Sequence, residues 1–269
     1  MNSENFLFAL GLTIFAGLST GVGSAMAFLS KNFNPKFLAG SLGFSAGVMI
    51  YVSLIEIFVK AKDSLTILYG YKQGYFVTVL AFFGGITLIA LIDWLVPSYE
   101  NPHELKYIDE SVSFDQTKKD KLMRMGMFSA LAIGIHNFPE GLATFIGALQ
   151  DPALGVSIAV AIAIHNIPEG IAVSVPIYFA TKNRKKAFTY SFLSGLAEPV
   201  GAIIGYFILI KYSSDAVFGI VFAGVAGIMV YISLDELLPT AEEFGEHHVA
   251  IYGLISGMAV MAISLLLFV

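Results

Sequence analysis

The chain alternates between long apolar stretches and short segments rich in charged or turn-forming residues. A bilayer core about 30 Å thick needs roughly 20 apolar helical residues per crossing. Eight stretches meet this length: residues 5–29, 36–59, 74–97, 123–148, 153–179, 187–210, 215–239 and 248–268. The pattern predicts an all-α multi-pass membrane protein, with eight transmembrane helices in one domain covering 1–269 and a flexible polar loop at 98–121.

Composition narrows the class of protein further. The 269 residues are 57% hydrophobic and 13% charged, whereas soluble domains carry about a quarter charged residues. Eight crossings therefore leave no room for a separate soluble catalytic domain. The absence of cysteine excludes disulfides and thiolate metal sites. The N-terminal segment has no basic residue, so we expect a retained helix rather than a cleaved signal peptide.

The distribution of Lys and Arg predicts how the helices are oriented. With the N-terminus outside, the inner loops hold 11 of the 15 basic residues and the outer loops hold 4. Cytoplasmic loops normally carry the excess of Lys and Arg. Both termini are therefore expected outside, and the 98–121 loop, with its single His103, is expected in the cytoplasm.

A short internal repeat links the fourth and fifth helices. Residues 132–143 (AIGIHNFPEGLA) and 161–172 (AIAIHNIPEGIA) are identical at nine of twelve positions. Only a short turn separates the two helices, so they must run antiparallel.

A longer repeat relates the two ends of the chain. Residues 47–61 resemble 227–241, and residues 17–28 more weakly resemble 195–206, with nearly the same shift along the chain in both cases. Chance similarity between apolar helices is the alternative for the weaker match. Five crossings separate the copies, so the second copy is inverted. We expect a 3+2+3 arrangement of inverted repeats, which secondary transporters use for alternating access.

Seven polar side chains lie near the middle of three predicted spans. They are His136, Asn137, Glu140, His165, Asn166, Glu169 and Glu198. A charged residue at this depth costs about 2.5–3.5 kcal/mol on insertion scales, so the glutamates need protonation, mutual hydrogen bonds or a bound cation. The spacing of four places each histidine and its glutamate on one helix face. The prolines between them also free backbone carbonyls one turn back.

These donors favour a particular class of metal. Imidazole, carboxylate and amide oxygen without thiolate suit Zn²⁺, Fe²⁺, Mn²⁺ or Co²⁺ rather than Cu⁺. Ca²⁺ and Mg²⁺ prefer oxygen ligands alone. In the alternative interpretation, the same side chains only tether the helices together. Two copies of the motif and a third carboxylate at the same depth favour a metal site between the fourth, fifth and sixth helices.

The two HN[FI]PEG motifs, the GLAEP segment and the SLIE and SLDE copies resemble the ZIP family of metal transporters. The resemblance covers essentially all eight helices, and the compact length is similar to that of bacterial members. It implies uptake into the cytoplasm across the bacterial inner (plasma) membrane. Zinc would be the main substrate, with Fe²⁺, Mn²⁺, Co²⁺ and Cd²⁺ as further substrates, and no cofactor or enzymatic activity is implied.

The resemblance also implies a two-metal centre in which Glu140 and Glu169 bridge. The first site would use His136, Glu140, His165 and Glu169, and the second would use Asn137, Glu140, Asn166, Glu169 and Glu198. Eukaryotic members often have a histidine-rich cytoplasmic loop. Here that loop has only His103, so we expect no zinc-sensing role for it.

Two other functions remain as alternatives. A channel-like pore for the same ions would need the same ligands at mid-membrane depth. An intramembrane zinc hydrolase is disfavoured because the sequence has no H-E-x-x-H motif. As partners we expect divalent metal ions and the lipid bilayer, and no nucleic acid. Small residues predict close helix packing, within one chain or between the chains of a homodimer: Gly17, Gly21, Gly43 and Gly47.

Acidic residues near helix ends are weaker candidates for a function. Glu56, Asp93, Asp235 and Glu236 either relay ions to and from the central site or are simply interfacial. The acidic and histidine-containing segment at 242–248 is expected to be a solvated loop.

Overall fold

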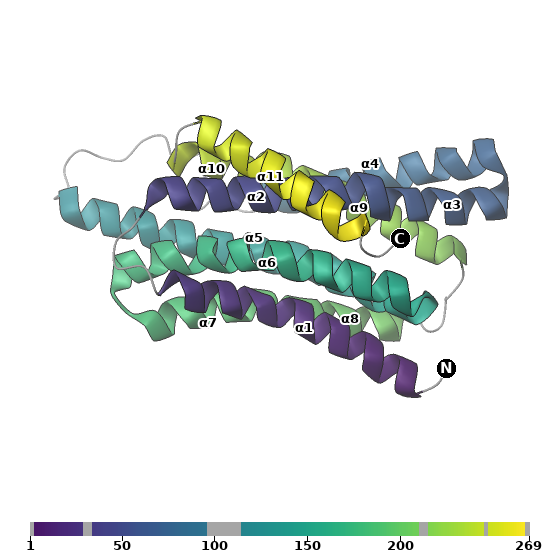
Figure 1. Cartoon of the computed structure of the whole chain (residues 1–269), viewed down its shortest axis with the longest axis horizontal. Coiled ribbons are helices and arrows are strands. Elements are labelled where there is room, and N and C mark those ends of the chain that lie inside the picture. Colours follow the sequence, from purple (N-terminus) through teal and green to yellow (C-terminus); the bar gives the residue numbers. More distant parts are fainter. Residues whose placement is uncertain (1–2, 29–33, 96–113, 210–214, 245–246, 267–269) are drawn as a thin grey trace.

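The protein is a bundle of long helices (Figure 1). The computed structural model describes residues 3–28, 34–95, 114–209, 215–244 and 247–266, and no strand occurs within these ranges. The elements are α1 (Ser3–Ala27), α2 (Pro35–Val52), η1 (Ser53–Ile57), α3 (Phe58–Tyr69), α4 (Tyr71–Leu95), α5 (Phe114–Gln150), α6 (Pro152–Thr181), α7 (Arg184–Gly195), α8 (Ala197–Leu209), α9 (Asp215–Ile232), η3 (Ser233–Leu237), α10 (Leu238–Phe244) and α11 (His247–Leu266).

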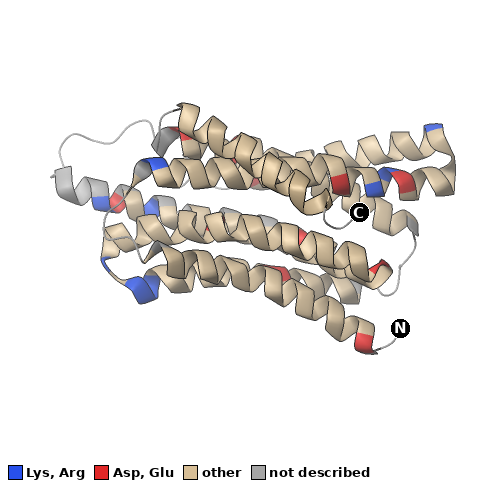
Figure 2. Cartoon of the chain, in the orientation of Figure 1, with Lys and Arg blue, Asp and Glu red and all other residues tan. Residues whose placement is uncertain are grey.

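Seven helices in the described part of the chain are long and apolar enough to cross a membrane. The 37-residue α5 corresponds to the remaining predicted span. The prediction of an all-helical, multi-pass membrane protein is therefore confirmed. Both termini lie at the same end of the bundle (Figure 1), as an even number of crossings requires. Most Lys and Arg lie toward the ends of the bundle, whereas acidic positions also occur midway along it (Figure 2).

Some helices extend beyond the predicted spans. α5 begins at Phe114, so the last part of the predicted 98–121 loop is helical. Residues 96–113, which include His103, lie outside the described residues. The second span continues through α3 to Tyr69 rather than ending at 59. Both extensions carry charged residues, and hydropathy detects only the part of a helix that can sit in lipid.

Two π-helical segments interrupt long helices at equivalent positions. η1 joins α2 to α3, and η3 joins α9 to α10 at the matching place in the longer repeat. The hydroxyls of Ser53 and Ser233 donate to the carbonyls of Met49 and Met229, at 2.6 and 2.7 Å. Each hydroxyl therefore bonds the carbonyl four residues back at the first residue of a π segment. Such turns are frequently found at functional sites.

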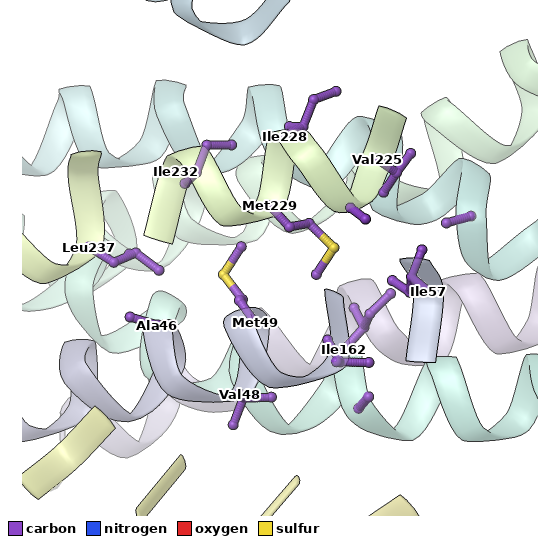
Figure 3. Close-up of a cluster of buried hydrophobic side chains, with 14 of the residues drawn as sticks. Ala46, Val48, Met49, Ile57, Ile162, Val225, Ile228, Met229, Ile232 and Leu237 are labelled. Atoms are coloured by element: carbon purple, nitrogen blue, oxygen red, sulfur yellow. The ribbon is translucent and has the colours of Figure 1, made fainter. Parts of the chain in front are cut away.

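The helices pack in two groups that contact each other along one seam. α1 and α5–α8 form the first group, and the remaining helices form the second. The contact of α2 with α6 is the most extensive one between them. In the second group, Met49 and Met229 point into the space between α2 and α9 (Figure 3). These two methionines are equivalent in the longer repeat, so its copies face each other here.

Close backbone contacts also recur between equivalent helices. A Cβ on Gly257 of α11 would collide with the carbonyl oxygen of Phe44 in α2. A Cβ on Gly85 of α4 would collide with the carbonyl oxygen of Gly224 in α9. The register that aligns Met49 with Met229 also aligns Phe44 with Gly224. The pair α2–α11 therefore packs as the pair α9–α4 does.

Three of the glycines expected at helix contacts pack within the chain. Gly17 lies against the carbonyl oxygen of Gly195, and Gly43 and Gly47 lie against those of Ala250 and Leu254. The homodimer therefore stays a prediction, because these close contacts are used inside one protomer.

Candidate metal centre

Three helices of the first group carry the predicted ligands into the interior of the protein. α5 supplies Asn137 and Glu140, α6 supplies His165, Asn166 and Glu169, and α8 supplies Glu198. All six side chains are completely buried. The seventh, His136, has its backbone in α5, but its side chain lies outside the described set.

Histidine, asparagine and carboxylate side chains contact one another between these helices. His165 Nε2 lies 3.2 Å from Glu140 Oε2, which connects α6 to α5. Asn166 Nδ2 donates to Glu198 Oε1, which connects α6 to α8. One segment of α6 is therefore bonded to carboxylates on both neighbouring helices.

The two asparagines occupy equivalent positions on their helices. Asn166 Nδ2 donates to the carbonyl of Ala16 in α1 at 2.9 Å. Asn137 Nδ2 donates to the carbonyl of Ser194 in α7 at 3.1 Å. Ala16 and Ser194 match in the weaker long repeat, since each directly precedes the glycine that begins its copy. The HNxPE motif of α5 is thus bonded to α7 and the motif of α6 to α1, and these two partner helices match each other in that repeat.

Proline accounts for the break before Glu198. Pro199 has no N–H to bond the carbonyl of Gly195, four residues back. The helix is interrupted at Leu196, and Glu198 falls in the first turn of α8. The freed Gly195 carbonyl contacts Gly17 of α1 instead. The positive end of the helix dipole faces residues in the first turn and favours a negative charge there.

Ser45 and Thr20 belong to this region although the sequence analysis did not select them. Ser45 Oγ, from α2, donates to Glu169 Oε1 and to the carbonyl of His165, both at 3.3 Å. Ser45 therefore reaches the site across the seam between the helix groups. Thr20 of α1 is buried and stands at the position equivalent to Glu198 in the repeat. In the sequence, the alignment of Thr20 with Glu198 in the longer repeat is the signal that could have identified Thr20.

Several buried oxygens near the motifs have no hydrogen-bond partner among the described residues. They are Asn137 Oδ1, Glu140 Oε1, Asn166 Oδ1, Glu198 Oε2 and Thr20 Oγ1. Most buried polar atoms in folded proteins are paired, and leaving one unpaired costs about 1–3 kcal/mol. All five have lone pairs. The arrangement therefore offers acceptor oxygens to a cation.

Within the described side chains, His, Asp and Glu do not come together as a group of three or more suited to a metal ion. Instead, the predicted ligands meet in pairs. The other acidic candidates lie outside the buried cluster, in partly exposed positions: Glu56, Asp93, Asp235 and Glu236. Tyr231 hydrogen-bonds Asp235 at the η3 end of α9.

Comparison with known proteins identifies the family. A family model described as ZIP zinc transporter matches residues 94–265, well over half of the chain. The chain belongs to the ZIP family. All seven predicted ligands fall within the matched ZIP region.

Relatives named zinc transporter ZupT match this ZIP-family chain over nearly its whole length. One from Chlorobium chlorochromatii is 69% identical over 266 residues, covering 99% of both chains. One from Streptococcus mutans is 65% identical over 267 residues, covering 99% of this chain and 100% of its own. Because ZIP proteins are transporters, the expectation of a transporter rather than a hydrolase is confirmed.

Proposed function

We propose that this ZIP-family chain takes up zinc across the plasma membrane into the cytoplasm through the buried group of His, Asn and Glu side chains. The observation that carries the proposal is the set of buried, unpartnered oxygens on Asn137, Glu140, Asn166 and Glu198. Glu140 also contacts His165 through its other carboxylate oxygen. A dehydrated cation needs such donors when it gives up its water shell. The names of the full-length relatives support zinc as the main cargo.

The proposed centre holds two metal ions. His136, Glu140, His165 and Glu169 form the first site, and Asn137, Glu140, Asn166, Glu169 and Glu198 form the second. Glu140 supports the bridging role, because Oε2 faces His165 while Oε1 has no partner in the part of the chain that the structure describes. Coordination through His165 Nε2 requires the His165–Glu140 contact to open, since the single Nε2 lone pair cannot serve both a proton and a metal. The Asn166–Glu198 bond uses other atoms than the oxygens Asn166 Oδ1 and Glu198 Oε2 that would face the metal.

The donor set also bears on the range of cargo. Imidazole with carboxylate and amide oxygens accommodates Fe²⁺, Mn²⁺, Co²⁺ and Cd²⁺ as further substrates beside zinc. We propose them as secondary cargo. Their relative rates depend on how far the paired side chains separate.

The proposed architecture is a 3+2+3 inverted repeat with both termini outside, in a bacterial inner membrane. The matched π segments, the matched helix pairs and the facing methionines Met49 and Met229 support the repeat. The distribution of basic residues supports the orientation. Such symmetry allows a rocking motion to expose one site alternately to each side.

Zinc-65 uptake into proteoliposomes tests the proposal. Glu169→Ala and His165→Ala each remove a buried ligand, so we expect saturable uptake to fall at least about tenfold in both. Glu4→Ala, at an exposed position in α1, serves as the matched control and should transport normally. Size-exclusion profiles and helical circular dichroism show whether the variants are folded. Undiminished uptake in both folded variants would remove the site from the transport path.

The same vesicles distinguish a carrier from a pore. A carrier gives saturable flux and counterflow of labelled zinc against unlabelled zinc. Linear flux at high concentration without counterflow would identify the channel-like alternative.

A further inference from the structure

An apolar crevice opens between α4, α5, α7 and α9, away from the metal motifs' buried face. Its volume is about 740 Å³, within the range of about 300–1,000 Å³ typical of ligand pockets. None of its described lining residues is charged. Its main side chains are Leu88, Ile92, Met127, Leu131, Phe138 and Leu193.

The crevice has the depth of one membrane leaflet. Met127 and Phe138 lie about three helical turns apart on α5, roughly 16 Å at about 1.5 Å per residue. Half of a hydrocarbon core about 30 Å thick is nearly the same length. Leu131 and Leu193 are 49% and 58% exposed at its mouth. Because these helices span the membrane, that exposure faces acyl chains, and the crevice opens sideways into lipid.

One end of the crevice coincides with the membrane interface. Trp94, 79% exposed, follows Ile92 by two positions on α4. Tryptophan is enriched where the hydrocarbon meets the headgroups. The crevice therefore begins at headgroup level and runs inward to Phe138.

Basic residues stand at that same end on both helices that flank the opening. Arg124 precedes Met127 by three positions on α5, and Lys186 precedes Tyr190 by four on α7, so each shares a helix face with a lining residue. Both are exposed, and no ion pair joins either of them to a described residue. Figure 2 shows basic positions at the starts of α5 and α7, at one end of the bundle.

We propose that the crevice binds an anionic phospholipid, with an acyl chain along α5 and its phosphate beside Arg124 and Lys186. The apolar lining excludes a headgroup from the crevice itself, and the two basic side chains favour a negatively charged headgroup at the membrane-interface end of the crevice. Basic pockets between membrane helices on the cytoplasmic side are suited to anionic headgroups. Phe138 and Pro139 line the crevice, so the chain lies directly against the HNFPE segment of α5.

This site goes beyond the proposed transport function, and its test needs no transport. The purified protein in mild detergent is titrated with phosphatidylglycerol or phosphatidylcholine of identical acyl chains. Bound lipid is counted by native mass spectrometry, and the melting temperature is followed in parallel. Phosphatidylglycerol should bind more tightly and stabilise more, since a ligand bound only to the folded state raises stability.

Charge variants test the headgroup contact. Lys186→Gln should weaken phosphatidylglycerol binding about fivefold, the usual effect of one basic residue near an anionic surface. The double variant Arg124→Gln/Lys186→Gln should remove most of the preference over phosphatidylcholine. Lys185→Gln is the matched control, because Lys185 points about 100° around the same helix. An equal loss with Lys185→Gln, or equal binding of both lipids by the wild type, would overturn the proposal.

A filling variant tests the acyl-chain contact. Leu131→Trp places an indole in the mouth of the crevice and should weaken both lipids. Leu80→Trp, at a position 62% exposed on α4 outside the crevice, should weaken neither. Unchanged binding in folded Leu131→Trp would also overturn the proposal. If that variant does not fold, the comparison of Lys186 with Lys185 decides alone.

Discussion

Asn137 and Asn166 have the same place in the repeated motif but different surroundings. Asn137 donates to the carbonyl of Ser194. Asn166 donates both to the carbonyl of Ala16 and to the carboxylate of Glu198. The difference matters energetically, because Asn166 makes two side-chain hydrogen bonds where Asn137 makes one, and each bond typically contributes about 1 kcal/mol.

We therefore expect Asn166→Ala to destabilise the protein more than Asn137→Ala. Losing the single bond of Asn137 should cost about 1 kcal/mol, whereas losing both bonds of Asn166, which leaves a buried Glu198 oxygen unpaired, should cost about 2–3 kcal/mol. Denaturant unfolding in detergent micelles, followed by circular dichroism, measures the difference. Each variant is the control for the other, and equal losses would mean that Asn166 and Glu198 are not effectively bonded.

Single residues of the site were partly predictable from the sequence. The doubled HNxPE motif and GLAEP identified six side chains that the structure buries completely. Ser45 and Thr20 were missed because hydroxyls in membrane helices usually bond their own backbone, as Thr13 and Thr144 do. The usual acceptor for Thr20 would be the Ala16 carbonyl, which already accepts from Ser19 and from Asn166. The Ser19 bond is local, but the Asn166 bond is a long-range contact which no local pattern reveals.

At the scale of helices, the glycine that ends each motif sets how closely two helices approach. A Cβ on Gly141 of α5 would collide with the carbonyl oxygen of Glu198 in α8. A Cβ on Gly170 of α6 would collide with the carbonyl oxygen of Thr20 in α1. The two contacts are equivalent in the repeat. Backbone rather than side chain is the obstacle, so neither helix can yield by changing a rotamer.

Gly141→Ala should therefore push α8 away from α5 and displace Glu198 from the site. Overpacking of this kind typically costs about 1–3 kcal/mol, and we expect zinc uptake to fall along with the melting temperature. Gly134→Ala is a matched control in the same helix, since its nearest neighbour would lie at 3.8 Å. The comparison is made by thermal unfolding and zinc-65 uptake. Normal uptake by Gly141→Ala would show that transport does not need this close contact between α5 and α8.

Helix existence was predictable, but interruptions within helices were not. Apolar length predicted the spans, and the repeat aligned residues 47–61 with 227–241. The π turns at Ser53–Ile57 and Ser233–Leu237 were missed, because they involve one extra residue per turn and leave hydropathy unchanged. The break at Leu196 was missed too, although Pro199 was a visible signal.

For the molecule as a whole, the site lies where the two helix groups meet. Ser45 belongs to one group, while His165 and Glu169 belong to the other. Any movement of one group relative to the other must change the Ser45 contacts. In the proposed transport cycle, relative motion and metal binding would therefore be coupled through the α2–α6 seam.

Uptake should also depend on pH, because metal ligands must be deprotonated. Protons compete with zinc for the imidazole and carboxylates of the site, so saturable uptake should fall several-fold between about pH 7.5 and about 5.5. Zinc-65 uptake is measured with the same pH on both sides of the vesicle, which separates competition from any proton gradient. Uptake that is constant across this range would contradict protonation of the ligands.

The unpartnered oxygens on Asn137, Glu140, Asn166 and Glu198 have a consequence for the lifetime of the protein in a cell. They lower the stability of the metal-free protein, and a cation bound at the proposed site would offset that loss to an extent set by the ratio of its concentration to its dissociation constant. Proteases remove membrane proteins from the fraction that is transiently unfolded. A cell rich in zinc would thus keep each copy of the protein longer, whereas zinc scarcity would shorten the half-life of the protein. Zinc supply would then set the abundance of its own importer without a sensor protein or a change in transcription.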